Sequence, residues 1–187
     1  MGDKKRILLI GSGGREHAIA HQLLKSPRCE VLYIAPGNPG TFQCGENVSL
    51  DVTDKDAVLN FIEDKNIDLT FVGPEQPLAD GIVDVFNAAG HAIVGPNKEA
   101  SQLESSKAWA KSKYDKYGIP TAKFEQFNEL DKALDYVTQK NSYPIVIKAD
   151  GLAAGKGVTI AATIDEAKQA LEDCFVNKVF KTAGDCV

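Results

Sequence analysis

The chain contains 187 residues, of which 43% are hydrophobic and 25% charged, with 21 lysines and arginines against 26 aspartates and glutamates. This composition is typical of a globular protein, and the net charge of −5 argues against a nucleic-acid partner held mainly through its phosphates. No apolar run approaches the roughly 20 residues that cross a bilayer, so we expect no membrane partner. The N-terminal apolar run is too short for a secretory signal, so we expect a cytoplasmic location and four reduced cysteines.

Short apolar runs alternate with helical patterns through the first half of the chain. The runs expected to be strands are RILLI at 6–10, VLYIA at 31–35, NVSL at 47–50, LTFVG at 69–73 and AIVG at 92–95. The helices expected between them cover about 15–25, a stretch opened by Thr53 and Asp54, and a stretch that carries Ile82, Val83 and Phe86. This alternation predicts an α/β domain with an open, mainly parallel, Rossmann-like sheet that is covered on both faces.

The pattern changes at Gly95, Pro96 and Asn97. We expect next a long polar helical stretch at about 98–117, a strand at 123–127, a helix at 129–140, strands PIVIKA at 144–149 and GVTIAA at 157–162, and a helix opened by a capping box of Thr163 and Glu166. We therefore predict an α/β substrate-binding domain at 1–97, a helical linker at 98–120 and a smaller α+β unit at 121–187.

The first glycine cluster, GSGGREH at 11–17, stands where a strand passes into a helix. Unpaired amides and the helix dipole stabilise an anion there, so the cluster predicts a phosphate site, although a simple tight turn is the alternative. A dinucleotide motif would require glycine or alanine where Glu16 stands, and an acidic residue where the second strand ends in Ala35 and Pro36. The pattern therefore disfavours NAD.

Two further loops, PGNPG at 36–40 and GPEQPLADG at 73–81, follow other strands of the same predicted sheet. Because ligands gather at the carboxyl ends of parallel strands, we expect all three loops to meet in one crevice. Glu75 and Asp80 could accept hydrogen bonds from a sugar or an amine, or could instead be residues at helix starts.

The second glycine cluster lies between the predicted strands at 144–149 and 157–162. Lys148 stands near the end of the first strand, and Lys156 and three glycines follow it, a pattern typical of a loop that covers a triphosphate. It is not a P-loop, because Gly157 and Val158 follow the second lysine where that motif requires serine or threonine. Lys107 lies on the predicted linker that leads into this region, and taken alone it is interpreted as a solvent-exposed helix lysine.

His17 and His21 are spaced like zinc ligands on one helix face, but HExxH and a third ligand are both lacking, so helix packing or substrate contact is the favoured interpretation. Trp109 is interpreted as core between domains and not as a stacking platform.

Six segments occur together in one order: GSGGREHA, APGNPGT, VGPEQPLADGI, QLESSKAWAK, YGIPTA and IKADGLAAGKGV. In these the chain resembles the glycinamide ribonucleotide synthetase family of the ATP-grasp superfamily. The resemblance implies a pre-ATP-grasp domain followed by the first part of an ATP-grasp unit. It also implies a ligase of purine synthesis that uses ATP and Mg²⁺ to join glycine to 5-phosphoribosylamine through glycyl phosphate, without a protein nucleophile.

The resemblance also implies roles for individual residues. Lys107 and Lys148 would contact ATP phosphates and serve catalysis. The residues of the lid would be Gly151, Leu152, Ala153, Ala154, Gly155, Lys156 and Gly157. The phosphoribosylamine side would be lined by Gly11, Ser12, Gly13, Gly14, Arg15, Glu16, Gly37, Asn38, Pro39, Gly40, Gly73, Pro74, Glu75 and Asp80.

The family continues well past residue 187, so we expect this chain to be a fragment whose parent could also be fused to later purine-pathway domains. We expect no metal ligand among these 187 residues, and the magnesium ligands are expected beyond residue 187. For the 187 residues alone we expect binding without turnover. A non-catalytic nucleotide- or phosphosugar-binding fragment is therefore the alternative function, and a Rossmann-type oxidoreductase is a weaker one.

Overall fold

The computed structural model describes residues 3–153 and 156–180. The chain divides into two compact units, Met1–Ser101 and Gln102–Val187, which are described separately below. This division falls inside the predicted linker at 98–120. Within the described residues, no helix is both long enough and apolar enough to cross a bilayer.

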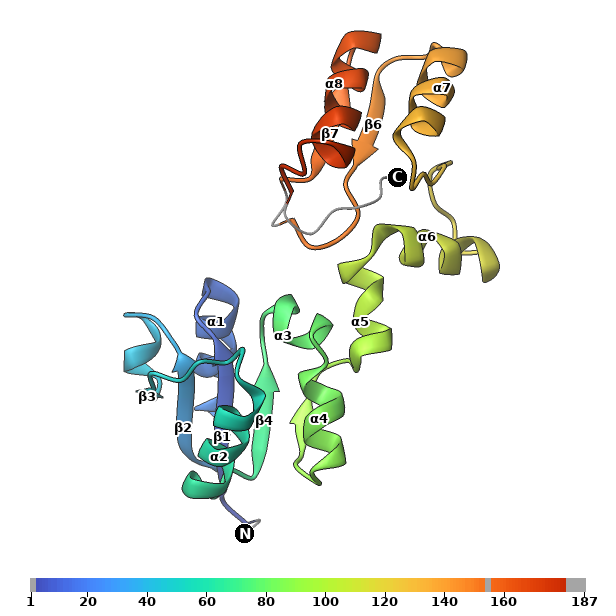
Figure 1. The fold of residues 1–187 in the computed structure, drawn as a ribbon. Coiled ribbons are helices and arrows are strands. Elements are labelled where there is room, and N and C mark those ends of the chain that lie inside the picture. Colours follow the sequence, from blue (N-terminus) through green and yellow to red (C-terminus); the bar gives the residue numbers. More distant parts are fainter. Residues whose placement is uncertain (1–2, 154–155, 181–187) are drawn as a thin grey trace. The chain divides into compact units, whose positions relative to one another are not determined.

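The first unit is built on a five-stranded parallel sheet with the strand order β3-β2-β1-β4-β5 (Figure 1). Its elements are β1 (Lys5–Gly11), α1 (Gly14–Leu23), β2 (Cys29–Pro36), the short 3-10 helix η1 (Thr41–Gln43), β3 (Glu46–Asn47), α2 (Lys55–Lys65), β4 (Leu69–Val72), α3 (Glu75–Ala79), α4 (Ile82–Ala88) and β5 (Ile93–Val94). The order of strands reverses between β1 and β4. In such sheets, ligands bind beyond the carboxyl ends of the strands at this reversal.

Alternate side chains of β1 build a separate core on each face of the sheet. Leu8 and Ile10 pack in a cluster with residues of α2 and α4, whereas Ile7 and Leu9 pack in a cluster that includes Ala20 of α1. All four β1 side chains are buried, as a parallel strand covered on both faces requires. The structure confirms the predicted α/β fold class.

The second unit contains an antiparallel pair, β6 (Ile145–Lys148) and β7 (Val158–Ala161). Helices α7 (Leu130–Lys140) and α8 (Ile164–Phe175) pack against one face of this pair, through a core that includes Val137, Ile147 and Leu171. The hydroxyl of Thr163 accepts the Glu166 N–H at 3.2 Å and so caps α8, as predicted. The carboxylate of Glu166 accepts instead the N–H of Ala162.

The structure refines one prediction for residues 98–127 and contradicts another. The helical stretch predicted at 98–117 is formed by two helices, α5 (Lys98–Ser105) and α6 (Lys107–Lys116), because extended Ser106 interrupts the first and caps the second with its hydroxyl. The predicted strand at 123–127 does not form, and only Phe127 at its end takes part in a single β-bridge. Side-chain hydrogen bonds hold its neighbourhood instead, from Lys111 to the Thr121 hydroxyl and from Gln126 to the Ala108 carbonyl.

Candidate functional sites

The first glycine cluster forms the junction of β1 and α1. The N–H of His17 donates to the Gly13 carbonyl at 3.1 Å and makes the first hydrogen bond of α1. The N–H groups of Gly14, Arg15 and Glu16 precede this bond and therefore lack partners within the helix. Ser12, Gly13, Gly14 and Arg15 are exposed. The predicted phosphate site thus has accessible backbone at the helix start.

Glu16 does not face solvent with its neighbours, because it is only 3% exposed. Its Oε2 accepts the Gly13 N–H at 2.6 Å, and its Oε1 accepts from Arg15 Nε at 3.0 Å. A Cβ added to Gly11 would lie 2.7 Å from Glu16 Cδ, and one added to Gly73 would lie 2.5 Å from Glu16 Cγ. The side chain therefore fills the space between the ends of β1 and β4, and this filling explains why glycines stand there.

Arg15 connects the first loop to the third. Its guanidinium donates to both carboxylate oxygens of Glu75, at 2.9 and 3.3 Å, as well as to Glu16. These hydrogen bonds to Glu75 and Glu16 raise the pKa of Arg15, and the bond from Arg15 holds the pKa of Glu75 below its ordinary value. Arg15 therefore stays charged and places a positive charge at this edge.

The second loop is held by the side chain of Asn38. Its Nδ2 donates to the Ser12 carbonyl at 2.8 Å, and its Oδ1 accepts the N–H groups of Gly40 at 2.7 Å and Thr41 at 3.1 Å. The ring of His17 packs against Gly40, where an added Cβ would lie 2.7 Å from Cε1. Asn38 thus shapes this loop and joins it to the first.

The structure brings all three predicted loops to the carboxyl end of β1. Besides the contacts of Asn38 and Arg15, the N–H groups of Gly37 and Gly73 donate to the carbonyls of Gly11 and Ile10. Glu75 begins α3, which fits the helix-start alternative, whereas Asp80 follows the last residue of that helix. Asp80 accepts from Gln76 through its carboxylate and from Lys55 through its carbonyl. The remaining predicted members, Pro39 and Pro74, lie within these loops.

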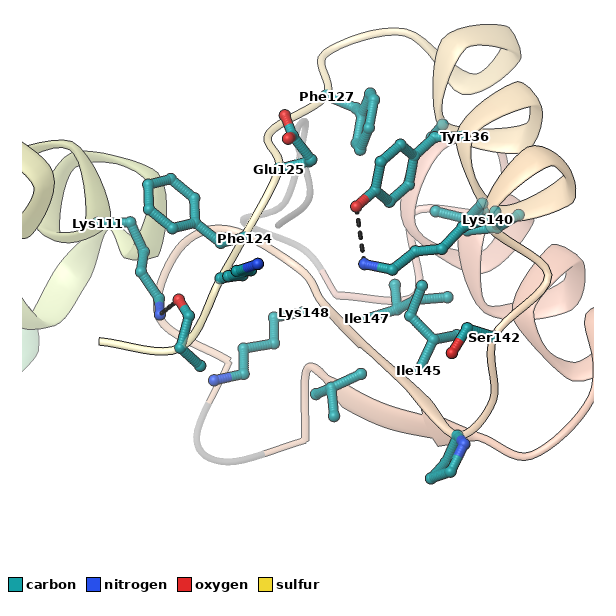
Figure 2. Close-up of a pocket in the computed structure, with 17 residues that line it drawn as sticks. Lys111, Phe124, Glu125, Phe127, Tyr136, Lys140, Ser142, Ile145, Ile147 and Lys148 are labelled. Carbon is teal, nitrogen blue, oxygen red and sulfur yellow. Dashed lines mark hydrogen bonds between the residues drawn. The ribbon is translucent and has the colours of Figure 1, made fainter. Parts of the chain in front are cut away.

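In the second unit, Lys148 ends β6 and lines a cavity of about 330 Å³ (Figure 2). This volume is within the range of small-molecule sites. Lys148 is half-buried, and no described residue forms a hydrogen bond or ion pair with its ammonium group. A cation held in this way is available to an anionic ligand.

The cavity contains residues that sequence reasoning did not select. The side chains around it include Lys111, Phe124, Phe127, Tyr136, Lys140 and Ile147. The ammonium of Lys111 is already bound to Thr121 Oγ1 at 2.6 Å. Lys140 donates to the Tyr136 hydroxyl at 2.8 Å, as Figure 2 shows. These residues could be identified only once the packing of α6, α7 and β6 was known, because no sequence motif marks them.

Lys107 begins α6, and its ammonium donates to the Gly151 carbonyl at 2.9 Å. The predicted lid is closed at its base by the Ala149 N–H, which donates to the Gly157 carbonyl at 2.8 Å. Of the other predicted lid residues, Leu152, Ala153 and Lys156 are described, whereas Ala154 and Gly155 lie outside the described residues. The structure thus places Lys107 directly against the first glycine of the predicted lid.

A magnesium site is not evident in the described part of the chain. No group of three or more histidine, cysteine, aspartate or glutamate side chains there could hold a metal ion. Cys29, Cys44 and Cys174 are free thiols, and burial raises the pKa of Cys29 and Cys174. Trp109 is half-buried, and Lys113 lies over its ring at 4.5 Å.

Comparison with known proteins divides the chain in two. The family model described as phosphoribosylglycinamide synthetase, N domain, matches residues 5–104, and the model for the ATP-grasp (A) domain of the same enzyme matches residues 105–187. The phosphoribosylamine–glycine ligase of Vibrio cholerae is 48% identical over 97% of this chain and 43% of its own length. That of Agrobacterium fabrum is 52% identical over 96% of this chain and 42% of its own length.

Solved structures match the chain over nearly its whole length as well. The crystal structure of phosphoribosylamine–glycine ligase from Thermotoga maritima matches with a TM-score of 0.76 and 32% identity, over 97% of this chain and 42% of that chain. Biotin carboxylase from Campylobacter jejuni matches with a TM-score of 0.70 at 17% identity, over 98% of this chain and 44% of that chain. The second likeness shows the fold alone. The chain thus spans a little over two fifths of the length of these relatives.

Proposed function

Because the chain belongs to the phosphoribosylglycinamide synthetase family, we propose that its parent protein joins glycine to 5-phosphoribosylamine with conversion of ATP to ADP and phosphate. The observation that carries the proposal for this chain is Lys148, a half-buried cation without a partner among the described residues, in a cavity of ligand size. We also propose a cytoplasmic location, in keeping with a ligase that uses small soluble substrates.

On the ATP side, Lys148 and Lys107 supply positive charge, and the predicted lid supplies backbone N–H groups. Transfer of a phosphoryl group to the glycine carboxylate requires alignment and charge neutralisation but no protein nucleophile, and these groups suit that task. Magnesium bound to the phosphates would add further neutralisation. The described residues offer no set of ligands for it, so we assign it no residue of this chain.

On the phosphosugar side, the open N–H groups at the start of α1 and the guanidinium of Arg15 suit a phosphate. The loops at 36–40 and 73–75 form the remainder of this side, where Glu75 would have to exchange Arg15 for a ligand before it could accept a substrate hydrogen bond. Glu16 would hold these loops in place through its packing against Gly11 and Gly73. A dinucleotide is disfavoured, because the bulky side chain of Glu16 stands where the dinucleotide motif requires glycine or alanine for close packing of the helix on the strand.

For the 187 residues alone, we propose ligand binding without turnover, because they amount to only 42–43% of the relatives' length. The binding test is a calorimetric titration of this chain with ATP. Charged hydrogen bonds contribute about 1.5–3 kcal/mol, so Lys148→Ala should raise the Kd for ATP roughly 10- to 100-fold.

The matched control is Lys132→Ala, which removes an exposed helix lysine that is paired with Glu129. This variant should bind ATP as the wild type does. Equal affinities of the Lys148→Ala variant and the wild type would refute the role of Lys148. Release of ADP that requires both glycine and phosphoribosylamine tests the ligase activity in the full-length protein, and its appearance with the isolated chain would refute binding without turnover.

A further inference from the structure

Asp150 joins the start of the predicted lid to the first turn of α6, across more than 40 residues of sequence. Its Oδ1 accepts the N–H groups of Lys107 at 2.5 Å and Ala108 at 3.1 Å, and its Oδ2 accepts the Ser106 hydroxyl at 2.9 Å. The Ser106 oxygen in turn accepts the Trp109 N–H at 3.1 Å. The first three N–H groups of α6 are therefore all bound by Ser106 and Asp150.

The residues on either side of Asp150 are fixed as well. Ala149 is fully buried and donates its N–H to the Gly157 carbonyl, and the Gly151 carbonyl accepts the ammonium of Lys107. Gly151 has a φ of +100°, a conformation that favours glycine, so the chain turns sharply just after the bound carboxylate. Backbone and side chain of Lys107 are thus bound to consecutive residues, Asp150 and Gly151.

A carboxylate is well suited to this place. Negative charge is stabilised at the N-terminus of a helix, and hydrogen bonds to an ionised acceptor are stronger than neutral ones. Since Asp150 already takes the N–H groups that open α6, a ligand phosphate near Lys107 would have to rely on the lysine ammonium groups and on the lid backbone.

We propose that Asp150 is a positioning residue for the nucleotide phosphates. It holds Lys107 and the first residues of the glycine-rich loop in one fixed arrangement, so that ATP meets a site that is already ordered. This inference rests on the proposed function in one respect only, namely that ATP is the ligand of Lys107 and the loop.

The test compares ATP binding by the 187-residue chain and its Asp150→Ala variant, with Asp131→Ala as the control for loss of an exposed aspartate near the start of another helix. Calorimetry gives the Kd, and Trp109, the only tryptophan of the chain, reports by fluorescence on the first turn of α6. Asp150→Ala should raise the Kd about tenfold, the equivalent of losing one well-placed interaction. Asp131→Ala should leave it unchanged.

Rescue with formate distinguishes the proposed positioning role from a merely structural one, because formate can replace the missing carboxylate at the start of α6. In the Asp150→Ala variant, sodium formate should shift the amide resonances of Lys107 and Ala108 and recover part of the ATP affinity, whereas sodium chloride at equal ionic strength should do neither. In the wild type, formate should leave both resonances in place. Asp150→Asn keeps an acceptor oxygen and should therefore weaken ATP binding less than Asp150→Ala does. If the alanine variant does not fold, the asparagine variant provides the test.

Unchanged ATP affinity in both Asp150 variants, with normal binding by the wild type, would overturn the inference and leave the proposed function intact. Weakened binding that formate does not restore would also overturn it. Failure of the wild-type chain to bind ATP would overturn the proposed binding and this inference together, whereas the formate shifts at Lys107 and Ala108 would still show whether the carboxylate occupies the start of α6.

Discussion

Replacement of Gly73 by alanine should destabilise the first unit through a single collision with Glu16. The new Cβ would lie 2.5 Å from Glu16 Cγ and 2.7 Å from Cδ. Glu16 is buried and hydrogen-bonded to Gly13 and Arg15, so it cannot withdraw without loss of those bonds. Overpacking of this kind costs about 1–3 kcal/mol, and we expect about 2 kcal/mol for Gly73→Ala.

The cause can be isolated by a double-mutant cycle. Glu16→Ala alone should also destabilise, because it removes the acceptor of the Gly13 N–H, by about 1–3 kcal/mol. In the Glu16→Ala background, however, the side chain that the new Cβ would meet is gone, so Gly73→Ala should cost less than about 0.5 kcal/mol. The two substitutions should therefore be strongly non-additive.

Urea unfolding followed by far-UV circular dichroism measures these free energies, and the fluorescence of Trp109 reports separately on the second unit. Gly14→Ala serves as the control, because no atom lies within 4 Å of the Cβ it would add. It should change stability by no more than about 1 kcal/mol, towards greater stability. Additivity of Gly73→Ala and Glu16→Ala within about 0.5 kcal/mol would refute the proposed collision.

Three further outcomes are expected. Because Arg15 lowers the pKa of Glu75, the stability that their ion pair contributes is present above the ordinary glutamate pKa of 4.5 and is lost as the pH falls through the lowered pKa. Arg15→Gln should return the pKa of Glu75, measured by carbon NMR, towards 4.5. Asn38→Ala should lower the free energy of unfolding by about 1–3 kcal/mol, because it removes a hydrogen bond to the Ser12 carbonyl of the first loop and two bonds from the N–H groups of Gly40 and Thr41 within its own loop; an unchanged urea midpoint would contradict this. Thr163→Ala should cost about 1 kcal/mol through loss of the α8 cap, measured in the same way, whereas Thr163→Ser should cost little.

The sheet of the first unit could be predicted from sequence because its signal is local. RILLI and VLYIA are apolar runs bounded by turn residues, and they correspond to buried parts of β1 and β2. The two faces of β1 need apolar partners, which the helices between the strands provide. The loops at the strand ends then follow from topology alone, so the candidate site at the carboxyl edge could be located before any distance was known.

What could not be predicted is the direction of polar side chains and the pairing of distant ones. Nothing in GSGGREH says that Glu16 turns back under Gly11 and Gly73, and nothing in KADG says that Asp150 binds the start of a helix more than 40 residues earlier. The break at Ser106 was different, because a serine at the start of a helix is a recognisable cap. The predicted strand at 123–127 had the right residue types, but a strand also needs a partner, and that requirement is not local.

Glu16 and Asp150 change what the two glycine clusters can do. Each carboxylate binds backbone N–H groups at a helix start, and without it those groups would be open to a ligand: Gly13 at α1, and Lys107 and Ala108 at α6. Glycine-rich segments at such places are therefore not equivalent to empty anion sites, because the protein's own acids already occupy part of them. At α1 the N–H groups of Gly14 and Arg15 stay open beside a guanidinium, so backbone can bind a phosphate there. At α6 the N–H groups of the first turn are all bound, so the phosphates of ATP, the ligand that we propose for this side, would have to be held by the ammonium groups of Lys148 and Lys107 and by the loop.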